Sequence, residues 1–363
     1  MLSLLDMVAL ALWPGAAAGR HASILRGFLG AGGAVPDPAP PDLLACALAG
    51  LGAESPDAAA DRLRRQAGAA LARAADGGIA VLPWGDPRYP PLLAAIPDPP
   101  LALWLKGDPR CLADPAVAIV GSRAASQYGL EAAARLASEL SGAGMSIVSG
   151  LARGVDSGAH QGALAADGVT IAVLGSGVDV VYPPEHGALA GRIAARGAVL
   201  SEYPPGTPPL RPHFPMRNRV ISGLSLGVVV IEAALHSGSL ITAARALEQG
   251  RHVMAVPGNI LSGRFRGSHG LLRDGAAIVD DADDVLHELG SSSLRALCGR
   301  ETPPEQDAVL RAMAAGETYD VDAIALETGL NLPALLPRLL DLELRGRVVR
   351  VAGGRFVRAV RTC

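Results

Sequence analysis

The feature that most constrains the fold is a pair of short apolar runs, each ending in a turn of small residues. Residues 118–123 read AIVGSR and residues 147–152 read IVSGLA, and an alanine-rich stretch with helical spacing follows each. Two successive strand–loop–helix units place both loops at one edge of a parallel sheet, where open α/β folds bind ligands. Small residues let a ligand approach the backbone, and the first N–H groups of the next helix, together with Arg123, favour an anion. The sequence therefore predicts a site for a phosphorylated ligand.

The same alternation continues along the chain. Further apolar runs lie at residues 170–174, 198–201, 227–231 and 252–256, with amphipathic helical patterns between them, for example at 129–142 and 240–249. Strands that are apolar throughout are typical of a parallel sheet with both faces covered by helices. We therefore predict an α/β fold with a Rossmann-like, doubly wound parallel sheet as its core.

Changes in composition divide the chain into segments. Residues 1–75 contain short helical stretches broken by glycine- and proline-rich turns, and they predict a small helical N-terminal domain. Residues 76–290 hold the α/β core, which begins with an N-terminal extension of two strand-like runs. Residues 291–304 begin with serines and end with prolines, a composition typical of a linker.

Residues 305–363 have the pattern of a winged helix. Stretches with helical spacing at 321–326 and 332–344 precede a short hairpin pattern at 348–357, and three helices with such a wing form a common nucleic-acid-binding module. The wing is basic, with arginines at 345, 347, 350, 355, 358 and 361, whereas the helices before it are acidic. Both duplex DNA and a protein partner therefore stay open as ligands of this domain.

Bulk properties narrow the classes of function. A net charge of −3 argues against binding DNA through bulk charge but allows a local basic surface. No apolar run approaches the roughly 20 residues of a membrane span, and the chain start lacks the basic region of a signal peptide, so we expect a cytoplasmic protein. The four cysteines are scattered and the histidines lack metal-ligand spacing, so we expect reduced thiols and no metal.

Six motifs, in this order, resemble one family. They are residues 117–123 (VAIVGSR) with Tyr128-Gly129, residues 149–160 (SGLARGVDSGAH), Ser201-Glu202, residues 214–219 (FPMRNR) with 221–225 (ISGLS), residues 237–243 (SGSLITA) and residues 256–258 (VPG). Together they resemble the DNA-processing protein A (DprA/Smf) family, from about Trp84 to Arg358. The resemblance implies a Rossmann-like core that binds single-stranded DNA, protects incoming strands during natural transformation and hands them to the RecA recombinase. It also implies a homodimer formed through that core, no catalysis and no cofactor. A helical, SAM-like N-terminal domain and a C-terminal winged helix are its common accessories.

The candidate DNA-binding residues cluster in the basic part of the core. Residues 205–275 contain eight arginines against three acidic residues, and single-stranded DNA needs cations for phosphates and flat surfaces for bases. By resemblance, Arg211 meets a phosphate and Phe214 a base, although loop packing is the alternative for Phe214. Arg123 is expected to contact phosphate, with a core ion pair as the alternative. The complete predicted set is Gly121, Ser122, Arg123, Gly150, Arg211, Phe214, Arg217, Asn218, Arg219, Ser237, Gly238, Ser239 and Thr242.

Two arginines of this set are expected to differ in role. Arg217 and Arg219 are two positions apart, so on a helix they face different ways, and we expect one to contact DNA while the other braces the core. Ser237 and its neighbours form a small-residue turn at a helix start, which favours an anion.

Other classes of function stay open at this stage. Asp156 and His160 are four apart and share a helix face, as an acid–base pair would, or as an N-cap and a packed histidine. A phosphoribohydrolase-like nucleotide enzyme would need a Pro-Gly-Gly-x-Gly-Thr loop with a downstream Glu, which residues 237–243 lack. A dinucleotide oxidoreductase is less favoured because Gly121-Ser-Arg lacks the second glycine. A regulator could use the winged helix on duplex DNA. We assign no catalytic residue.

Overall fold

The structure, a computed structural model, describes residues 2–13, 42–290, 308–313, 318–344, 348–351 and 355–358. The chain divides into two compact units, Met1–Cys298 and Gly299–Cys363. The linker predicted at residues 291–304 lies outside the described residues, as does the proline-rich stretch of the N-terminal segment. Within the described ranges, no helix is both long and apolar enough to cross a membrane.

A nine-stranded, mostly parallel sheet forms the centre of the first unit, in the order β1-β2-β6-β5-β4-β3-β7-β8-β9. The strands are β1 (Ala80–Pro83), β2 (Ala102–Gly107), β3 (Ala116–Val120), β4 (Ser146–Ser149), β5 (Thr170–Leu174), β6 (Ala198–Ser201), β7 (Gly227–Val230), β8 (His252–Ala255) and β9 (Ala277–Ile278). Strands β3 to β9 run parallel, whereas β1 and β2 pair antiparallel at one edge. All six predicted strand runs are confirmed.

The strand order reverses between β3 and β7. From β3 the chain adds β4, β5 and β6 on one side, then returns to place β7, β8 and β9 on the other side of β3. Val120 of β3 lies opposite Val230 of β7, so both strands end at the same level and the loops that follow them are neighbours. In open α/β sheets this reversal point is where ligands bind.

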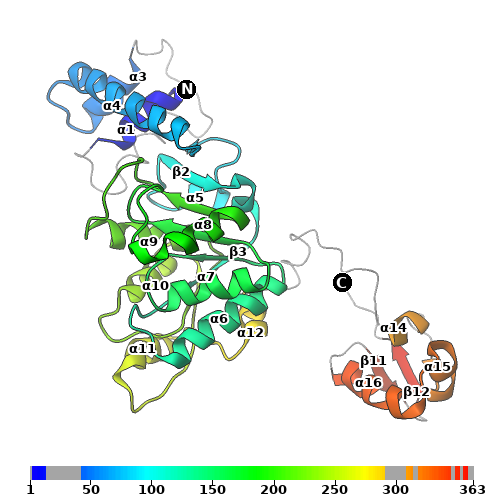
Figure 1. Ribbon diagram of the computed structural model, residues 1–363. Helices are drawn as coiled ribbons and strands as arrows, with labels where there is room; N and C mark the ends of the chain where they lie inside the picture. Colours follow the sequence, from blue (N-terminus) through cyan, green and yellow to red (C-terminus); the bar gives the residue numbers. More distant parts are fainter. Residues whose placement is uncertain are drawn as a thin grey trace. The chain divides into compact units, whose positions relative to one another are not determined.

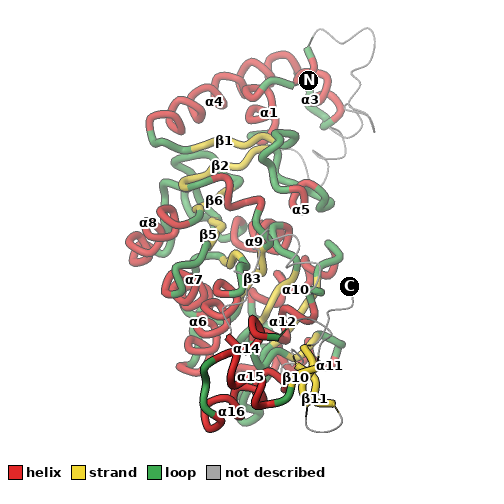
Figure 2. Tube along the Cα trace, turned by 90° about the vertical axis from the view of Figure 1, so that its right-hand side faces the viewer, coloured by secondary structure: helices red, strands yellow, loops and turns green. Residues whose placement is uncertain are grey.

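Helices cover both faces of the sheet, as the apolar strands predict. They are α5 (Pro91–Ala94), α6 (Gln127–Gly142), α7 (Val155–Ala165), α8 (Gly187–Arg196), α9 (His213–Gly223), α10 (Gly238–Glu248), α11 (Arg266–Arg273) and α12 (Ala282–Glu288). Helices α6, α7 and α12 pack on the face that carries Val117 and Ile119 of β3. Helices α9 and α10 pack on the opposite face with Ala118 and Val120. Figure 2 shows α6, α7 and α8 on one side of the strands and α9 and α10 on the other. The doubly wound prediction is confirmed.

The N-terminal helices pack against the β2 end of the sheet (Figure 1). They are α1 (Leu4–Ala11), α3 (Leu43–Gly50) and α4 (Pro56–Asp76). Arg64 of α4 ties the segment together, because its guanidinium pairs with Asp6 at 2.8 Å and with Asp42 at 2.7 Å. The apolar side chains of α1, α3 and α4 form one buried cluster with Trp104 of β2 and Ile193 of α8. Helix α4 has 21 residues, so the prediction of short helices is wrong there; the domain boundary at residue 75 stays a prediction.

The second unit has the elements of a winged helix, which confirms that part of the predicted fold. Its elements are α14 (Ala308–Ala312), β10 (Thr318–Tyr319), α15 (Val321–Thr328), α16 (Leu332–Leu344), β11 (Val348–Val351) and β12 (Arg355–Arg358), with sheet order β10-β12-β11. Ile324, Leu335, Leu339 and Phe356 form its core. Arginines 345, 347 and 361 of the predicted basic wing lie outside the described residues.

Candidate functional site

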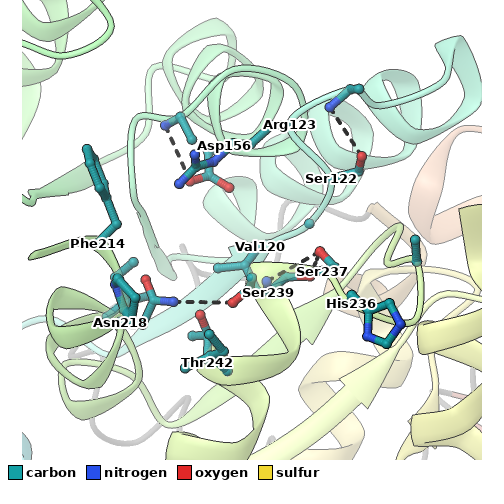
Figure 3. Close-up of a pocket in the computed structure, with 18 of the residues that line it drawn as sticks. Val120, Ser122, Arg123, Asp156, Phe214, Asn218, His236, Ser237, Ser239 and Thr242 are labelled. Carbon is teal, nitrogen blue, oxygen red and sulfur yellow. Dashed lines mark hydrogen bonds between the residues drawn. The ribbon is translucent and has the colours of Figure 1, made fainter. Parts of the chain in front are cut away.

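The candidate site is a pocket of about 1030 Å³ at the carboxyl ends of β3 and β7. Its lining comes from the loop after β3, the loop after β7, the start of α10 and one side of α9 (Figure 3). Eleven of the predicted DNA-binding residues line it: Gly121, Ser122, Arg123, Arg211, Phe214, Arg217, Asn218, Ser237, Gly238, Ser239 and Thr242. The fold therefore brings together loops that are more than a hundred residues apart in the sequence.

The loop after β3 reaches the pocket because its glycine allows a close approach. A Cβ on Gly121 would lie 2.6 Å from Cγ2 of Val155 at the start of α7, so only a residue without a side chain fits there. Arg123 follows in an exposed position, and its guanidinium carbon lies 5.4 Å from the Phe214 ring centroid, a cation–π arrangement. Among the described residues, no carboxylate lies within ion-pair distance of Arg123, so its charge is available to a ligand.

The start of α10 forms the opposite wall. Ser237 is the N-cap, and its Oγ accepts from the N–H of Ser239 and lies 2.7 Å from the Ser239 Oγ. A Cβ on Gly238 would meet nothing within 4 Å, so the backbone there is open to a ligand. Asn218 of α9 donates from Nδ2 to the Gly238 carbonyl at 3.3 Å, which joins the two helices. Free N–H groups and the helix dipole at such an end favour an anion.

Phe214 and Arg211 enter the pocket from the first turn of α9 and the loop before it. Arg211 is exposed, and Phe214 is half-buried between the Arg123 guanidinium and the ring of Tyr182. The Tyr182 and Phe214 centroids lie 5.6 Å apart. The pocket therefore presents flat apolar surface and positive charge side by side.

Arg217 is buried beneath this surface. Its Nη1 donates to the Gly150 carbonyl at 2.8 Å and to the Val173 carbonyl, and its Nε finds no hydrogen-bond partner among the described residues. Burial lowers the pKa of Arg217 to about 10, partly offset by the Asp156 carboxylate. A Cβ on Gly150 would overlap the Arg217 guanidinium. Gly150, which lines a smaller cleft beside the pocket, is thus the residue that makes room for Arg217.

Arg219 does not line the pocket, in contrast to the eleven residues of the predicted set named above. Its Nη1 and Nη2 each donate to Glu202 at 2.8 Å, and its Nε donates to Asp98 at 3.2 Å. Burial alone would lower the pKa of Arg219, but the two carboxylates outweigh burial and raise it. All three nitrogens are engaged within the protein, so Arg219 is the arginine of this pair that braces the core.

Asp156 and His160 have separate structural roles. The Asp156 carboxylate accepts from the N–H of Gly150 at 3.1 Å and of Ala152 at 3.4 Å; the N-cap of α7 is Gly154, so the N-cap reading of Asp156 is wrong. Burial raises the pKa of Asp156, opposed by Arg217 and these N–H groups. His160 is fully buried, with Nδ1 2.7 Å from the Thr170 hydroxyl. Since His160 does not reach the pocket, the two residues do not form an acid–base pair.

Sequence reasoning missed the polar or aromatic lining residues Tyr182, His236 and Arg266. Arg266 belongs to the basic stretch of residues 205–275 but is not in the predicted set. Tyr182 is one of five tyrosines in a chain with 3% aromatic residues, and this rarity was the available signal. Among the described residues, no cluster of three or more His, Cys, Asp or Glu side chains could hold a metal.

A buried carboxylate that the sequence did not single out joins the loops that form the pocket. Glu232, at the end of β7, is 0% exposed. It accepts from the Ser126 N–H at 3.0 Å and the Ser126 Oγ at 2.6 Å, and Arg264 approaches it at 3.4 Å. Glu232 thereby fastens the loop after β3 to the loops after β7 and β8.

Comparison with known proteins matches both units. A family model described as DNA recombination-mediator protein A matches residues 80–290, and one described as DprA winged helix domain matches residues 298–354. Protein Smf of Escherichia coli (strain K12) is 42% identical over 293 residues, covering 78% of each chain. DNA processing protein DprA of Streptococcus pneumoniae is 48% identical over 203 residues, covering 56% of this chain and 72% of that protein.

Solved structures agree with these matches. The X-ray structure of DNA processing protein A from Streptococcus pneumoniae superposes with a TM-score of 0.69 and 38% identity, over 79% of this chain and 99% of that one. DNA processing protein A from Helicobacter pylori, solved for its single-stranded DNA binding mode, superposes with a TM-score of 0.54 and 30% identity, over 59% of this chain and 96% of that one. With the matched models spanning the sheet and the winged helix, the chain belongs to the DNA-processing protein A (DprA/Smf) family.

Proposed function

We propose that this protein binds single-stranded DNA across the pocket at the ends of β3 and β7. The observation that carries the proposal is the composition of the pocket wall. Three exposed arginines, Arg123, Arg211 and Arg266, line the pocket together with the Phe214 ring, and the Arg123 guanidinium lies over that ring. Asp156 is the lining carboxylate among the described residues, and it is buried and bonded to backbone N–H groups. Cations for phosphates beside a flat ring for bases are what a single strand requires.

Family membership supports the rest of the proposal. The related protein from Helicobacter pylori binds single-stranded DNA. We propose that the present protein protects incoming strands in natural transformation, acts in the cytoplasm as a homodimer formed through the core, and delivers the strands to RecA. We propose binding rather than catalysis, because Asp156, the carboxylate that lines the pocket among the described residues, is engaged in hydrogen bonds to backbone N–H groups.

The test is the salt dependence of affinity for a fluorescent oligo-dT strand, measured by anisotropy beside a duplex of the same length. Three phosphate contacts at about −0.7 each predict a log–log slope of about −2. Arg123→Ala and Arg211→Ala should each weaken binding and flatten the slope by about one contact. Arg245→Ala is the matched control, because Arg245 lies in the last turn of α10, paired with Glu248. A folded Arg123→Ala/Arg211→Ala protein that binds as tightly as the wild type would refute this site.

A second variant separates base contact from charge. Phe214→Ala should lose about 1–3 kcal/mol of binding, roughly 5- to 150-fold, with the salt slope unchanged. Phe214→Tyr should keep the affinity. A change in slope without this loss would mean that Phe214 only positions Arg123.

A further inference from the structure

A smaller cleft lies beside the pocket and shares Phe214 and Tyr182 with its lining. This cleft, about 40 Å³, is lined by Arg123, Gly150, Ala152, Arg153, Tyr182, Pro183, Phe214 and Arg217. It holds only a few water molecules, so a base could not enter it. A base could instead lie on the ring that borders it.

Tyr182 offers such a ring. Among the Phe, Tyr and Trp side chains that the structure describes, Tyr128 and Tyr182 are the two exposed ones, at 50% and 40%. Tyr182 borders both the pocket and the cleft. Its ring is tilted by 50° to that of Phe214 at a centroid distance of 5.6 Å, so the two rings touch and leave no room for a base between them. They present two separate faces to a strand that passes over them.

A cation also lies near Tyr182: Arg153 lines the same cleft, just as Arg123 lies beside Phe214. The Arg153 side chain is 58% exposed, and it pairs with Glu185 at 2.6 Å. Such an exposed ion pair contributes little to stability, so a phosphate could replace Glu185 as the partner of Arg153 at small cost.

We propose that Tyr182 is a second base-stacking position and that Arg153 holds the adjoining phosphate, so that the bound strand leaves the pocket over the loop after β5. This inference rests on the proposed function and adds the course that the bound strand takes beyond the pocket. The chain then offers two consecutive pairs of a cation and an aromatic ring, Arg123 with Phe214 and Arg153 with Tyr182. Each ring stacks on a base without regard to sequence.

The test compares variants of the full chain on oligo-dT strands of about 6 and about 20 nucleotides, one near the short end and one beyond the long end of common single-strand site sizes, about 4–16 nucleotides. Tyr182→Ala should weaken binding of the longer strand by roughly 5- to 150-fold and the shorter strand less. Tyr182→Phe should restore binding, since the ring is kept. Tyr128→Ala is the matched control, because this exposed tyrosine lies on α6 and does not line the pocket or the cleft.

A second pair of variants acts on charge and includes a gain of affinity, which misfolding would not produce. Arg153→Ala should flatten the salt slope by about 0.7. Glu185→Gln should tighten binding, because it removes the carboxylate that competes with phosphate for Arg153. Ultraviolet crosslinking of an iodo-deoxyuridine strand should label the peptide that contains Tyr182.

The outcomes separate this inference from the proposed function. If Phe214→Ala loses affinity while Tyr182→Ala binds like the wild type and Glu185→Gln gives no gain, the inference is overturned and the proposed function stands. If the wild-type protein binds no single strand at all, both are overturned.

Discussion

Removing the Arg219 guanidinium should destabilise the fold while leaving single-strand affinity intact. Arg219 lies on α9, only a few residues beyond Phe214 and Arg217, yet its side chain is 10% exposed and faces away from the pocket lining. It holds Glu202, which follows β6, and Asp98, which precedes β2. The ion pair therefore connects α9 to the part of the sheet where β2 pairs with β6.

The expected loss follows from the burial of the two partners. Breaking a buried ion pair by removing one member costs about 3–5 kcal/mol, because the other charge is left uncompensated. Both carboxylates keep 17% exposure and regain some water in Arg219→Ala, so we expect the lower end, about 3 kcal/mol. A domain with a typical stability of about 5–15 kcal/mol stays folded after such a loss. Its melting temperature should fall by roughly 6–12 °C.

The assay is urea unfolding followed by circular dichroism, combined with strand affinity under native conditions. Arg211→Ala serves as the opposite case, because Arg211 is exposed and lines the pocket. It should leave the free energy of unfolding nearly unchanged and weaken strand binding, whereas Arg219→Ala should do the reverse. An Arg219→Ala protein that unfolds at the wild-type urea concentration, or that loses strand affinity as Arg211→Ala does, would refute the reasoning.

Three further outcomes are expected. Burial lowers the pKa of His160 to about 3, and the electrostatic effects of Arg217 and His186 add to this. Between about pH 6.5 and 3 the unfolded chain therefore binds this proton and the folded chain does not, so the free energy of unfolding falls by up to about 1.4 kcal/mol per pH unit as the pH drops. In urea unfolding at several pH values, His160→Asn should reduce this pH dependence, and an unchanged dependence would contradict the assignment. Gly150→Ala should weaken strand binding, because the new methyl group displaces the Arg217 guanidinium; equal anisotropy titrations would count against that role. A chain ending at Gly290 should keep nearly full single-strand affinity and lose duplex or partner binding; a large single-strand loss in a folded truncated chain would make the winged helix part of the main site.

The sheet could be predicted from sequence because its strands carry their own signal. Runs such as residues 227–231 are apolar at every position, which only a strand covered on both faces tolerates. The pocket lining followed from the same signal, since Gly121 and Ser237 end or follow such runs and therefore gather at one edge. Helix α4 was also readable in principle: Ser55-Pro56 marks a start, and buried alanines and Leu63 recur along one face.

The roles of individual arginines depended on distant partners. The spacing of Arg217 and Arg219 showed that they face different ways, but not which one meets the pocket. Arg219 finds Asp98, which is 121 residues away in the sequence, and no local pattern records that contact. The rarity of tyrosine singles out Tyr182 as a candidate, but its nearness to Phe214 follows only from the placement of the loop after β5 beside α9.

Glu232 explains how three separate loops around the pocket keep one fixed arrangement. A carboxylate buried to 0% exposure is costly unless it is hydrogen-bonded, and Glu232 meets this need with the N–H and hydroxyl of Ser126. The same atoms fix the first turn of α6, since Ser126 is also its N-cap. A Cβ on Gly129 would lie 2.7 Å from Glu232 Oε2, so glycine there leaves the carboxylate its space. The strands β3 and β7 belong to opposite halves of the sheet, so the hydrogen bonds between Ser126 and Glu232 connect the two halves where the strand order reverses. They hold the loop that carries Arg123 in place without a ligand. A site whose loops are already ordered loses less conformational entropy on binding, which suits the proposed binding of single strands of any sequence through few contacts.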